Sequence, residues 1–301
     1  MWSFLIIAVL YAGVLRSTSG EILTKPDSLG VRSSILTKAA AFTAVYYATS
    51  MFVLGKTWYG GRQLVPFHFY NDNMAYLQMD KLGHAFGSYV YSYMGYHFLK
   101  HYGFTKSEAL YFGATLGFVL QLPVELMDGF HEGYGFSWGD IAANTTGSVL
   151  LAGQELLLND QVVKYKFSYR ESPYSQNANG YLGESGFDRL MSDYNGHTYW
   201  LSAPVFRLIF RKAPRWLNMA LGYSANGMYG EFENIREYQG MAIPETPRYR
   251  QLLLSPDIDW TRIQTNSGFL KILLKGLTFF KMPLPAIEYN SMGRLKGYWL
   301  Y

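Results

Sequence analysis

Residues 125–147 read ELMDGFHEGYGFSWGDIAANTTG, and this stretch sets acidic and amide side chains beside two long apolar segments. Carboxylates at the edges of apolar helices are costly to desolvate, so they usually have partners or a chemical task. A second polar group stands upstream at residues 80–84, DKLGH. Together the two stretches predict a polar site at the ends of apolar helices, although they name no reaction.

The overall composition favours a protein of a membrane or a membrane interface. Of the 301 residues, 49% are hydrophobic, 18% aromatic and 16% charged, whereas about 25% are charged in ordinary globular proteins. A mean hydropathy of -0.04 is too low for a chain that is transmembrane throughout. The net charge of +4 does not indicate a nucleic-acid partner. The sequence holds no phosphate-binding or dinucleotide fingerprint, so we expect no nucleotide and no cofactor.

The first residues predict export. Residues 2–15 are apolar and residues 17–20 are small and polar, which is typical of a signal peptide over residues 1–20. A retained anchor helix is the alternative. Residues 21–33 read as a linker. The sequence holds no cysteine, which excludes disulfides, thiolate zinc sites, a cysteine nucleophile and a lipid attached to an N-terminal cysteine. We expect an exported, membrane-associated protein of the bacterial cell envelope, at the outer membrane or the periplasmic face.

Hydrophobic patterning changes after residue 158. Residues 34–158 hold four apolar helical segments, at about 39–54, 79–101, 109–127 and 138–158. Residues 159–301 alternate between polar and apolar side chains, with turn signals between the runs and one helix predicted at 268–280. The predicted fold class is α+β: an N-terminal membrane-associated bundle of about four helices, then a β-rich C-terminal domain. A small barrel and a soluble or interfacial sheet both fit that second pattern.

Asp80 and His84 stand four residues apart, so they face the same side of a helix. An aspartate one turn from a histidine can fix the imidazole tautomer and raise its basicity. The alternative is structural: Asp80 would favour the positive end of the helix dipole, and His84 would be a packing residue. Lys81 lies between them as a candidate binding residue.

The downstream stretch offers further candidates. Glu125 and Asp128 lie on one helical face, where two carboxylates can share a proton or hold a hard cation. Ser137 and Asp140 fit a helix N-cap with a capping box. Asn144, one turn further on, is not explained by capping. One histidine with several carboxylates suits magnesium, manganese or iron better than zinc, but there is no close histidine pair, so a metal stays undetermined.

The segment DKLGHAF at residues 80–86, with Glu125 and GFSWGDIAANTTG at residues 135–147, resembles the VanZ-like membrane proteins. It is still more similar to the related YfiM-type family of predicted periplasmic proteins of unknown function. The resemblance covers about residues 75–155, and the sequence departs from the VanZ pattern at Ala85, at Met127-Asp128 and at Gly135, where an arginine is usual. The matching positions are Asp80, Lys81, His84, Glu125, Ser137, Asp140, Asn144 and Gly147.

The resemblance implies a small helical membrane bundle whose polar residues converge, and it implies no particular reaction. VanZ-like proteins are associated with glycopeptide resistance, which suggests an envelope role. Two functions remain open. One is a non-enzymatic envelope protein that binds membrane lipid or an envelope protein, with Lys81, Asp128, Ser137 and Asn144 as binding residues. The other is a membrane-embedded hydrolase or transferase acting on a lipid or lipid-linked substrate. The candidate catalytic residues would be His84 as base with Asp80, Glu125 and Asp140.

Overall fold

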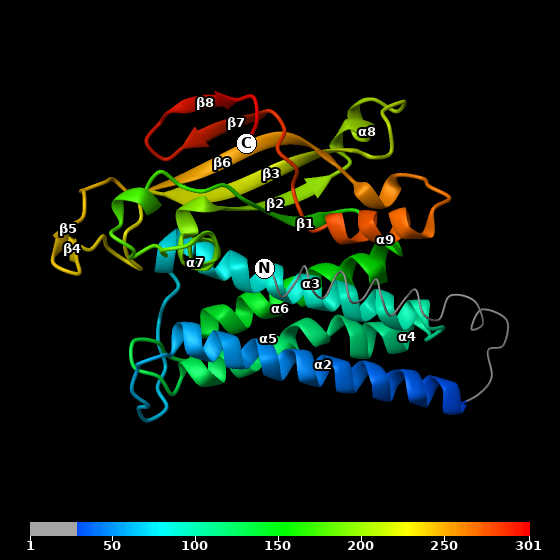
Figure 1. Cartoon of the computed structure of the whole chain (residues 1–301). Helices are drawn as coiled ribbons and strands as arrows, with labels where there is room; N and C mark the ends of the chain where they lie inside the picture. The colour runs from blue at the N-terminus through cyan, green and yellow to red at the C-terminus, as the bar shows by residue number, and fades with distance from the viewer. Residues whose placement is uncertain (1–28) are drawn as a thin grey trace. The chain divides into compact units, whose positions relative to one another are not determined.

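The computed structural model describes the chain from Leu29 to Tyr301 (Figure 1). The predicted signal peptide, residues 1–20, and residues 21–28 of the predicted linker lie outside the described residues. The chain forms two compact units that alternate along the sequence. The sheet unit consists of Asn73–Phe86 and Gly153–Tyr301, and the helix unit of residues 29–72 and Gly87–Ala152.

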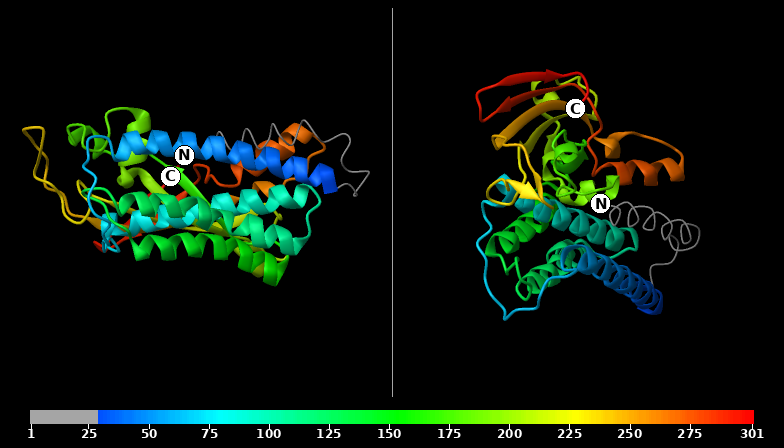
Figure 2. Two further views of the ribbon diagram at one scale, coloured as in Figure 1. Left: turned by 90° about the horizontal axis from the view of Figure 1, so that it is seen from below. Right: turned by 60° about the vertical axis from the view of Figure 1, so that its left-hand side comes forward.

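In the part of the chain that the structure describes, the helix unit is built from four long helices and two short helical segments (Figures 1 and 2). They are α2 (Leu29–Trp58), α3 (Met79–His101) from Gly87 onward, α4 (Lys106–Glu108), the π-helical turn η3 (Ala109–Ala114), α5 (Leu116–Asp128) and α6 (Trp138–Leu158) as far as Ala152. Thr105 starts α4 with a capping box to Glu108, which satisfies backbone N–H groups that a helix start leaves open. Among the described residues, the run Lys106–Asp128 is long and apolar enough to cross a bilayer, judged by length and composition.

Small residues let α3 approach α5 closely. A Cβ atom on Gly117 would lie 2.0 Å from the carbonyl oxygen of Ser88, and one on Gly95 would lie 2.7 Å from that of Gly113. The Ser92 hydroxyl donates to the Ala114 carbonyl (2.5 Å) at the same contact. Close backbone approach through glycine and serine is a packing mode of membrane helices, and these positions of α3 show it.

The sheet unit holds a six-stranded antiparallel sheet in the order β1-β2-β3-β6-β7-β8 (Figure 1). Its strands are β1 (Lys164–Tyr169), β2 (His197–Ala203), β3 (Leu217–Asn226), β6 (Tyr249–Ile258), β7 (Ala286–Asn290) and β8 (Leu295–Tyr298). A small ribbon pairs β4 (Glu237–Tyr238) with β5 (Met241–Ala242). The helical elements are η2 (Ala75–Gln78), the first turns of α3, the end of α6, η4 (Ser175–Asn177), α7 (Gly186–Ser192), η5 (Tyr194–Gly196), α8 (Val205–Ile209), η6 (Trp260–Arg262) and α9 (Gly268–Leu277).

One face of this sheet is polar and buried. Register places Lys166 beside Trp200, Trp200 beside Gly222 and Leu253 beside Glu288. Gly222 leaves room for the indole, because a Cβ atom there would lie 2.6 Å from the Trp200 ring. The other buried polar side chains on this face are Lys164, Thr198, Ser202, Asn218, Ser224, Gln251, Ser255, Asp257 and Asn290.

Lys281 and Tyr301 pack over Trp200 on the polar face, and the segment that carries Lys281 is bonded to the outer edge of β1. The Phe167 N–H donates to the Phe279 carbonyl (2.9 Å), and the Lys281 N–H donates back to the Phe167 carbonyl (2.9 Å). The Lys281 ammonium lies 5.2 Å from the centre of the Trp200 ring, and the Tyr301 ring packs edge-on against that ring at 5.8 Å. Burial lowers the pKa of Lys281 to about 8, with Asp257 opposing the shift.

The buried polar face holds an ion pair between Lys166 of β1 and Asp257 of β6. The Lys166 Nζ atom is 2.6 Å from the Asp257 Oδ2 atom, with side chains 0% and 1% exposed. Lys166 also donates to the Ile258 carbonyl (2.7 Å), and Ser202 donates to Asp257 (2.5 Å). Burial lowers the pKa of Lys166, and the Asp257 charge and hydrogen bond oppose that shift. A buried pair is stable only when both charges keep such partners.

The predicted fold class, an N-terminal membrane-associated bundle of about four helices followed by a β-rich domain, is wrong. The helices occupy the middle of the chain, after residues 1–28, and the first turns of α3 belong with the sheet. The physical reason is specific bonding: the Tyr165 hydroxyl donates to the Leu82 carbonyl (3.0 Å), and the Tyr223 hydroxyl donates to the Leu77 carbonyl (2.6 Å). Hydrophobic periodicity identifies a helix but not the surface on which each turn packs.

We predict that Asp257→Ala lowers the free energy of unfolding by about 3–5 kcal/mol, because it leaves the buried Lys166 charge without its partner. Urea unfolding of the detergent-solubilised protein, followed by circular dichroism, measures the change. The double variant Lys166→Met/Asp257→Leu should regain most of the loss, since it removes both members of the buried pair and leaves neither charge without its partner. A loss below about 1 kcal/mol in the single variant would show that the pair is solvated.

Candidate functional site

A strained turn fixes the start of α3. Tyr76, Leu77 and Gln78 have φ angles of 46°, 54° and 70°, a left-handed conformation that costs of order 1–3 kcal/mol for each such residue and is common at functional sites. Contacts within the sheet unit hold the turn: the Tyr76 N–H donates to the Glu231 carbonyl (2.8 Å), and Arg250 donates to the Gln78 side-chain oxygen (2.9 Å). The strands therefore determine where α3 begins.

Asp80 in the first turn of α3 collects three partners. Its Oδ1 atom is 3.8 Å from the His84 Nε2 atom, and its Oδ2 atom is 3.0 Å from the Lys81 Nζ atom. The Tyr194 hydroxyl donates to Oδ1 (3.4 Å), and the Tyr194 ring stacks on Tyr76 of the strained turn at 4.4 Å. Burial raises the pKa of Asp80, but His84, Lys81 and Tyr194 together outweigh burial and lower it. The carboxylate is therefore anionic beside the imidazole.

Aromatic side chains of β1 and β2 pack against the first turns of α3. Phe86 packs against Tyr165, Phe167 and Tyr199, with ring centres 5.6 to 6.0 Å apart. A Cβ atom on Gly83 would lie 3.0 Å from the Tyr199 hydroxyl oxygen, so glycine brings that hydroxyl close to the helix backbone. Burial, and then the Asp80 charge, raise the pKa of Tyr199. Its hydroxyl is thus a hydrogen-bond donor near the Asp80–His84 pair.

The downstream candidates lie in the helix unit. Asp128 accepts a hydrogen bond from the Tyr59 hydroxyl (2.5 Å). Burial, then Asp128 and more weakly Glu125, raise the pKa of Tyr59. Ser137 caps α6 by accepting from the Asp140 N–H (3.2 Å), which confirms the predicted N-cap, and its hydroxyl donates to Asp72 (2.5 Å).

Glu125, Asp140 and Asn144 are all buried in the helix unit. The backbone carbonyl of Asn144 accepts from the Ser88 hydroxyl (2.5 Å), and Ser88 continues to Ser148 (2.9 Å). Both polar side-chain atoms of Asn144 lack a hydrogen-bond partner among the described residues. This amide is the candidate whose burial is least explained by the surrounding structure.

The predicted residues thus form local groups. Asp80, Lys81 and His84 are together in the sheet unit, and Asp80 with His84 could supply two ligands to a divalent ion. His84 is expected to lie near Glu125 or Asp140. Because His84 belongs to the sheet unit and the two carboxylates belong to the helix unit, this proximity stays a prediction. Sequence reasoning missed Tyr194 and Tyr59. Both are aromatic residues in a tyrosine-rich chain, and no spacing rule connects them to Asp80 or Asp128.

We predict that Asp80→Asn lowers the free energy of unfolding by about 1–3 kcal/mol at neutral pH, because hydrogen bonds to a charged group are lost. The folded pKa of Asp80 lies below its unfolded value, so its contribution is present above the unfolded pKa and is lost as the pH falls through the folded one. Urea titrations at neutral and at acid pH should show the variant and wild type converging in acid. The control Asp188→Asn, at the exposed cap of α7, should change little. An equal deficit at both pH values would contradict the assignment.

We predict that Asn144→Leu raises the free energy of unfolding by about 1–3 kcal/mol, because a buried amide without partners carries an uncompensated desolvation cost. Thermal and urea unfolding in detergent measure this. Gln154→Leu is the matched control: the Gln154 side chain donates to the Val163 carbonyl (3.0 Å) and accepts from the Val163 N–H (2.6 Å). That control should be destabilised. Destabilisation of Asn144→Leu by a similar amount would show that the amide has a partner.

Residues 68–154 match the model of a protein family described as predicted periplasmic lipoproteins (DUF2279). The match includes every candidate residue from Asp80 to Asn144 and supports a location in the cell envelope, on the periplasmic side. No cysteine stands among the 301 residues to carry a lipid. No curated protein and no solved structure matches the chain. The similarity found for this chain is therefore confined to residues 68–154, and it is to predicted periplasmic lipoproteins of unknown function.

Proposed function

We propose that this chain is a non-enzymatic cell-envelope protein that binds membrane lipid through the exposed apolar face of its six-stranded sheet. The supporting observation is the inverted distribution of side chains on that sheet. The polar face is buried, whereas the opposite face leaves large apolar side chains in contact with solvent. These are Leu201, Leu221, Leu252, Leu254, Ile287, Tyr289 and Leu295.

Strand register makes these side chains one continuous surface. Leu201 pairs with Leu221, Leu221 with Leu254, and Leu254 with Ile287, so an unbroken apolar row crosses four strands. Soluble monomers rarely expose contiguous apolar patches of this kind, and such patches usually mark contacts with proteins or membranes. Phe86 and its aromatic neighbours cover the β1–β2 end of the same face.

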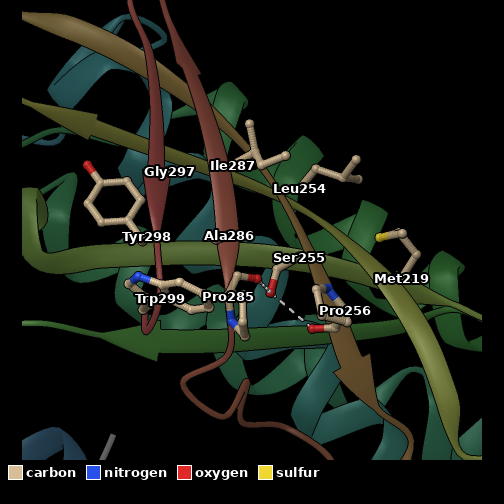
Figure 3. Close-up of a pocket in the computed structure, with 10 residues that line it drawn as sticks. All are labelled: Met219, Leu254, Ser255, Pro256, Pro285, Ala286, Ile287, Gly297, Tyr298 and Trp299. Carbon is tan, nitrogen blue, oxygen red and sulfur yellow. Dashed lines mark hydrogen bonds between the residues drawn. The ribbon is translucent and has the colours of Figure 1, made fainter.

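A groove of about 470 Å³ lies on this surface (Figure 3). Met219, Leu254, Ile287 and Trp299 line it with apolar side chains. The Ser255 hydroxyl is already bonded to the carbonyl oxygens of Pro256 (3.0 Å) and Pro285 (2.8 Å). Such a lining suits an acyl chain better than a polar ligand, because it offers few free hydrogen-bonding groups.

The match to periplasmic proteins is consistent with a surface that meets a membrane from the periplasmic side. We favour the outer membrane as the site of contact, or the periplasmic face of the envelope more generally. Lipid is the preferred partner, and an envelope protein that covers the same apolar face is the other outcome of the test.

The proposal predicts that purified protein co-sediments with lipid vesicles and that Leu252→Gln/Leu254→Gln weakens binding by roughly 30-fold. Each half-exposed leucine contributes about 1 kcal/mol when it leaves water, and 1.4 kcal/mol corresponds to a tenfold change. The control Phe232→Gln/Met241→Gln removes exposed apolar side chains outside the six-stranded sheet and should bind like wild type. If the wild-type protein does not bind vesicles and light scattering shows a stable dimer, the lipid proposal is contradicted, and the apolar face instead contacts a second molecule of the same protein.

The Asp80–His84 pair supports a second candidate function, a membrane-embedded hydrolase or transferase with His84 as base and Asp80 as the carboxylate that orients it. The supporting observation is the anionic Asp80 held 3.8 Å from the imidazole behind a strained turn. Incubation with envelope lipids, with products identified by mass spectrometry, tests it. Turnover by wild type but not by His84→Gln would support this reading, and absence of turnover would contradict it.

A further inference from the structure

We propose that the β2–β3 loop, residues 204–216, which includes the short helix α8, binds the head groups of anionic phospholipids. The loop reads PVFRLIFRKAPRW. This inference deepens the proposed function and rests on it, because the loop would engage the same membrane that meets the apolar face of the sheet. The loop would give the protein a preference for anionic over neutral phospholipids.

The β2–β3 loop is strongly basic. Arg207, Arg211, Lys212 and Arg215 are all exposed, and the loop has no acidic residue. None of the four makes an ion pair with a described residue. The whole sequence holds nearly balanced charge, 26 basic and 22 acidic residues, so four cations without an acid form a local positive surface. A positive surface is complementary to an anionic membrane.

Large apolar side chains alternate with these cations. Leu208 is 84% exposed and Ile209 67%, and Phe210 and Trp216 are also exposed. A loop that faces water is usually polar, whereas arginine beside aromatic and aliphatic residues is typical of a membrane interface. Arginine can lay its hydrocarbon stem on apolar surface while its guanidinium meets phosphate.

The loop lies next to the apolar groove of the sheet. The loop begins after Ala203, which ends β2, and ends before Leu217, which begins β3. Ala203 pairs with Met219, which lines the apolar groove of Figure 3. The cations therefore lie at the end of the sheet that borders the groove. A lipid whose chain contacts the apolar face would have its phosphate within reach of the loop.

Each cation near an anionic surface contributes about 1 kcal/mol, which is about a fivefold change in binding constant. We therefore expect the full chain to bind vesicles of phosphatidylcholine mixed with phosphatidylglycerol far more tightly than vesicles of phosphatidylcholine alone. The variant Arg207→Gln/Arg211→Gln should bind the mixed vesicles about 30-fold more weakly and the neutral vesicles as wild type does. High salt should remove the difference, because it screens exposed charges.

The matched control is Arg236→Gln/Arg294→Gln, which removes two exposed cations from the connections at the opposite end of the sheet. It should bind both kinds of vesicle as wild type does. Equal weakening in the two double variants would mean that net charge alone matters, which overturns the loop assignment. Wild-type binding that is the same for both vesicle types would overturn the head-group preference and leave the proposed function standing. Binding to neither would contradict both.

Discussion

Alternation along a β-strand is the constraint on which this molecule depends. Successive side chains point to opposite faces of a sheet, so a sheet that buries Lys166, Asp257 and Glu288 on one face must present the intervening residues on the other. Those residues are largely leucine, isoleucine and tyrosine. The buried ionic face and the exposed apolar face therefore follow from the same alternating sequence. A shift of one residue in the pairing of a strand would bring its apolar side chains to the buried face and its ionic side chains to the exposed face.

The same sheet also governs the helix that carries the Asp80–His84 pair. Three consecutive residues before α3 adopt left-handed backbone angles, which they would leave if the hydrogen bonds from Tyr223 and Arg250 were absent. Asp80 is thus positioned by residues far away in sequence. This arrangement makes the orientation of a carboxylate depend on strand pairing, and it explains why a helix and a sheet that are separate in sequence belong to one compact unit.

Sequence reasoning recovered the elements better than their partners. The helix predicted at 268–280 is α9 (Gly268–Leu277), because the apolar spacing that indicates a helix is a local property of the sequence. The alternation found in residues 159–301 does not show where a strand ends: β6 stops at Ile258, since the Asp259 side chain accepts from the Thr261 N–H (3.0 Å) and begins a helical turn. Which face of each strand is buried was beyond prediction: alternation is the same whether polar or apolar side chains point inward. The pairing of Asp80 with His84 followed from helical spacing, whereas Tyr194 reaches Asp80 only through the tertiary fold.

The two edges of the six-stranded sheet are protected from pairing with another chain in different ways. The outer edge of β1 is occupied at Phe167 by backbone bonds to Phe279 and Lys281, so it offers few free groups to another chain. The other edge is β8, which is only four residues long and includes Lys296. Short edges with a charged residue resist pairing with a second molecule. On a membrane surface of the kind proposed above, where crowding in two dimensions brings strand edges together repeatedly, such an edge would limit the growth of linear fibres and leave the molecules free to diffuse.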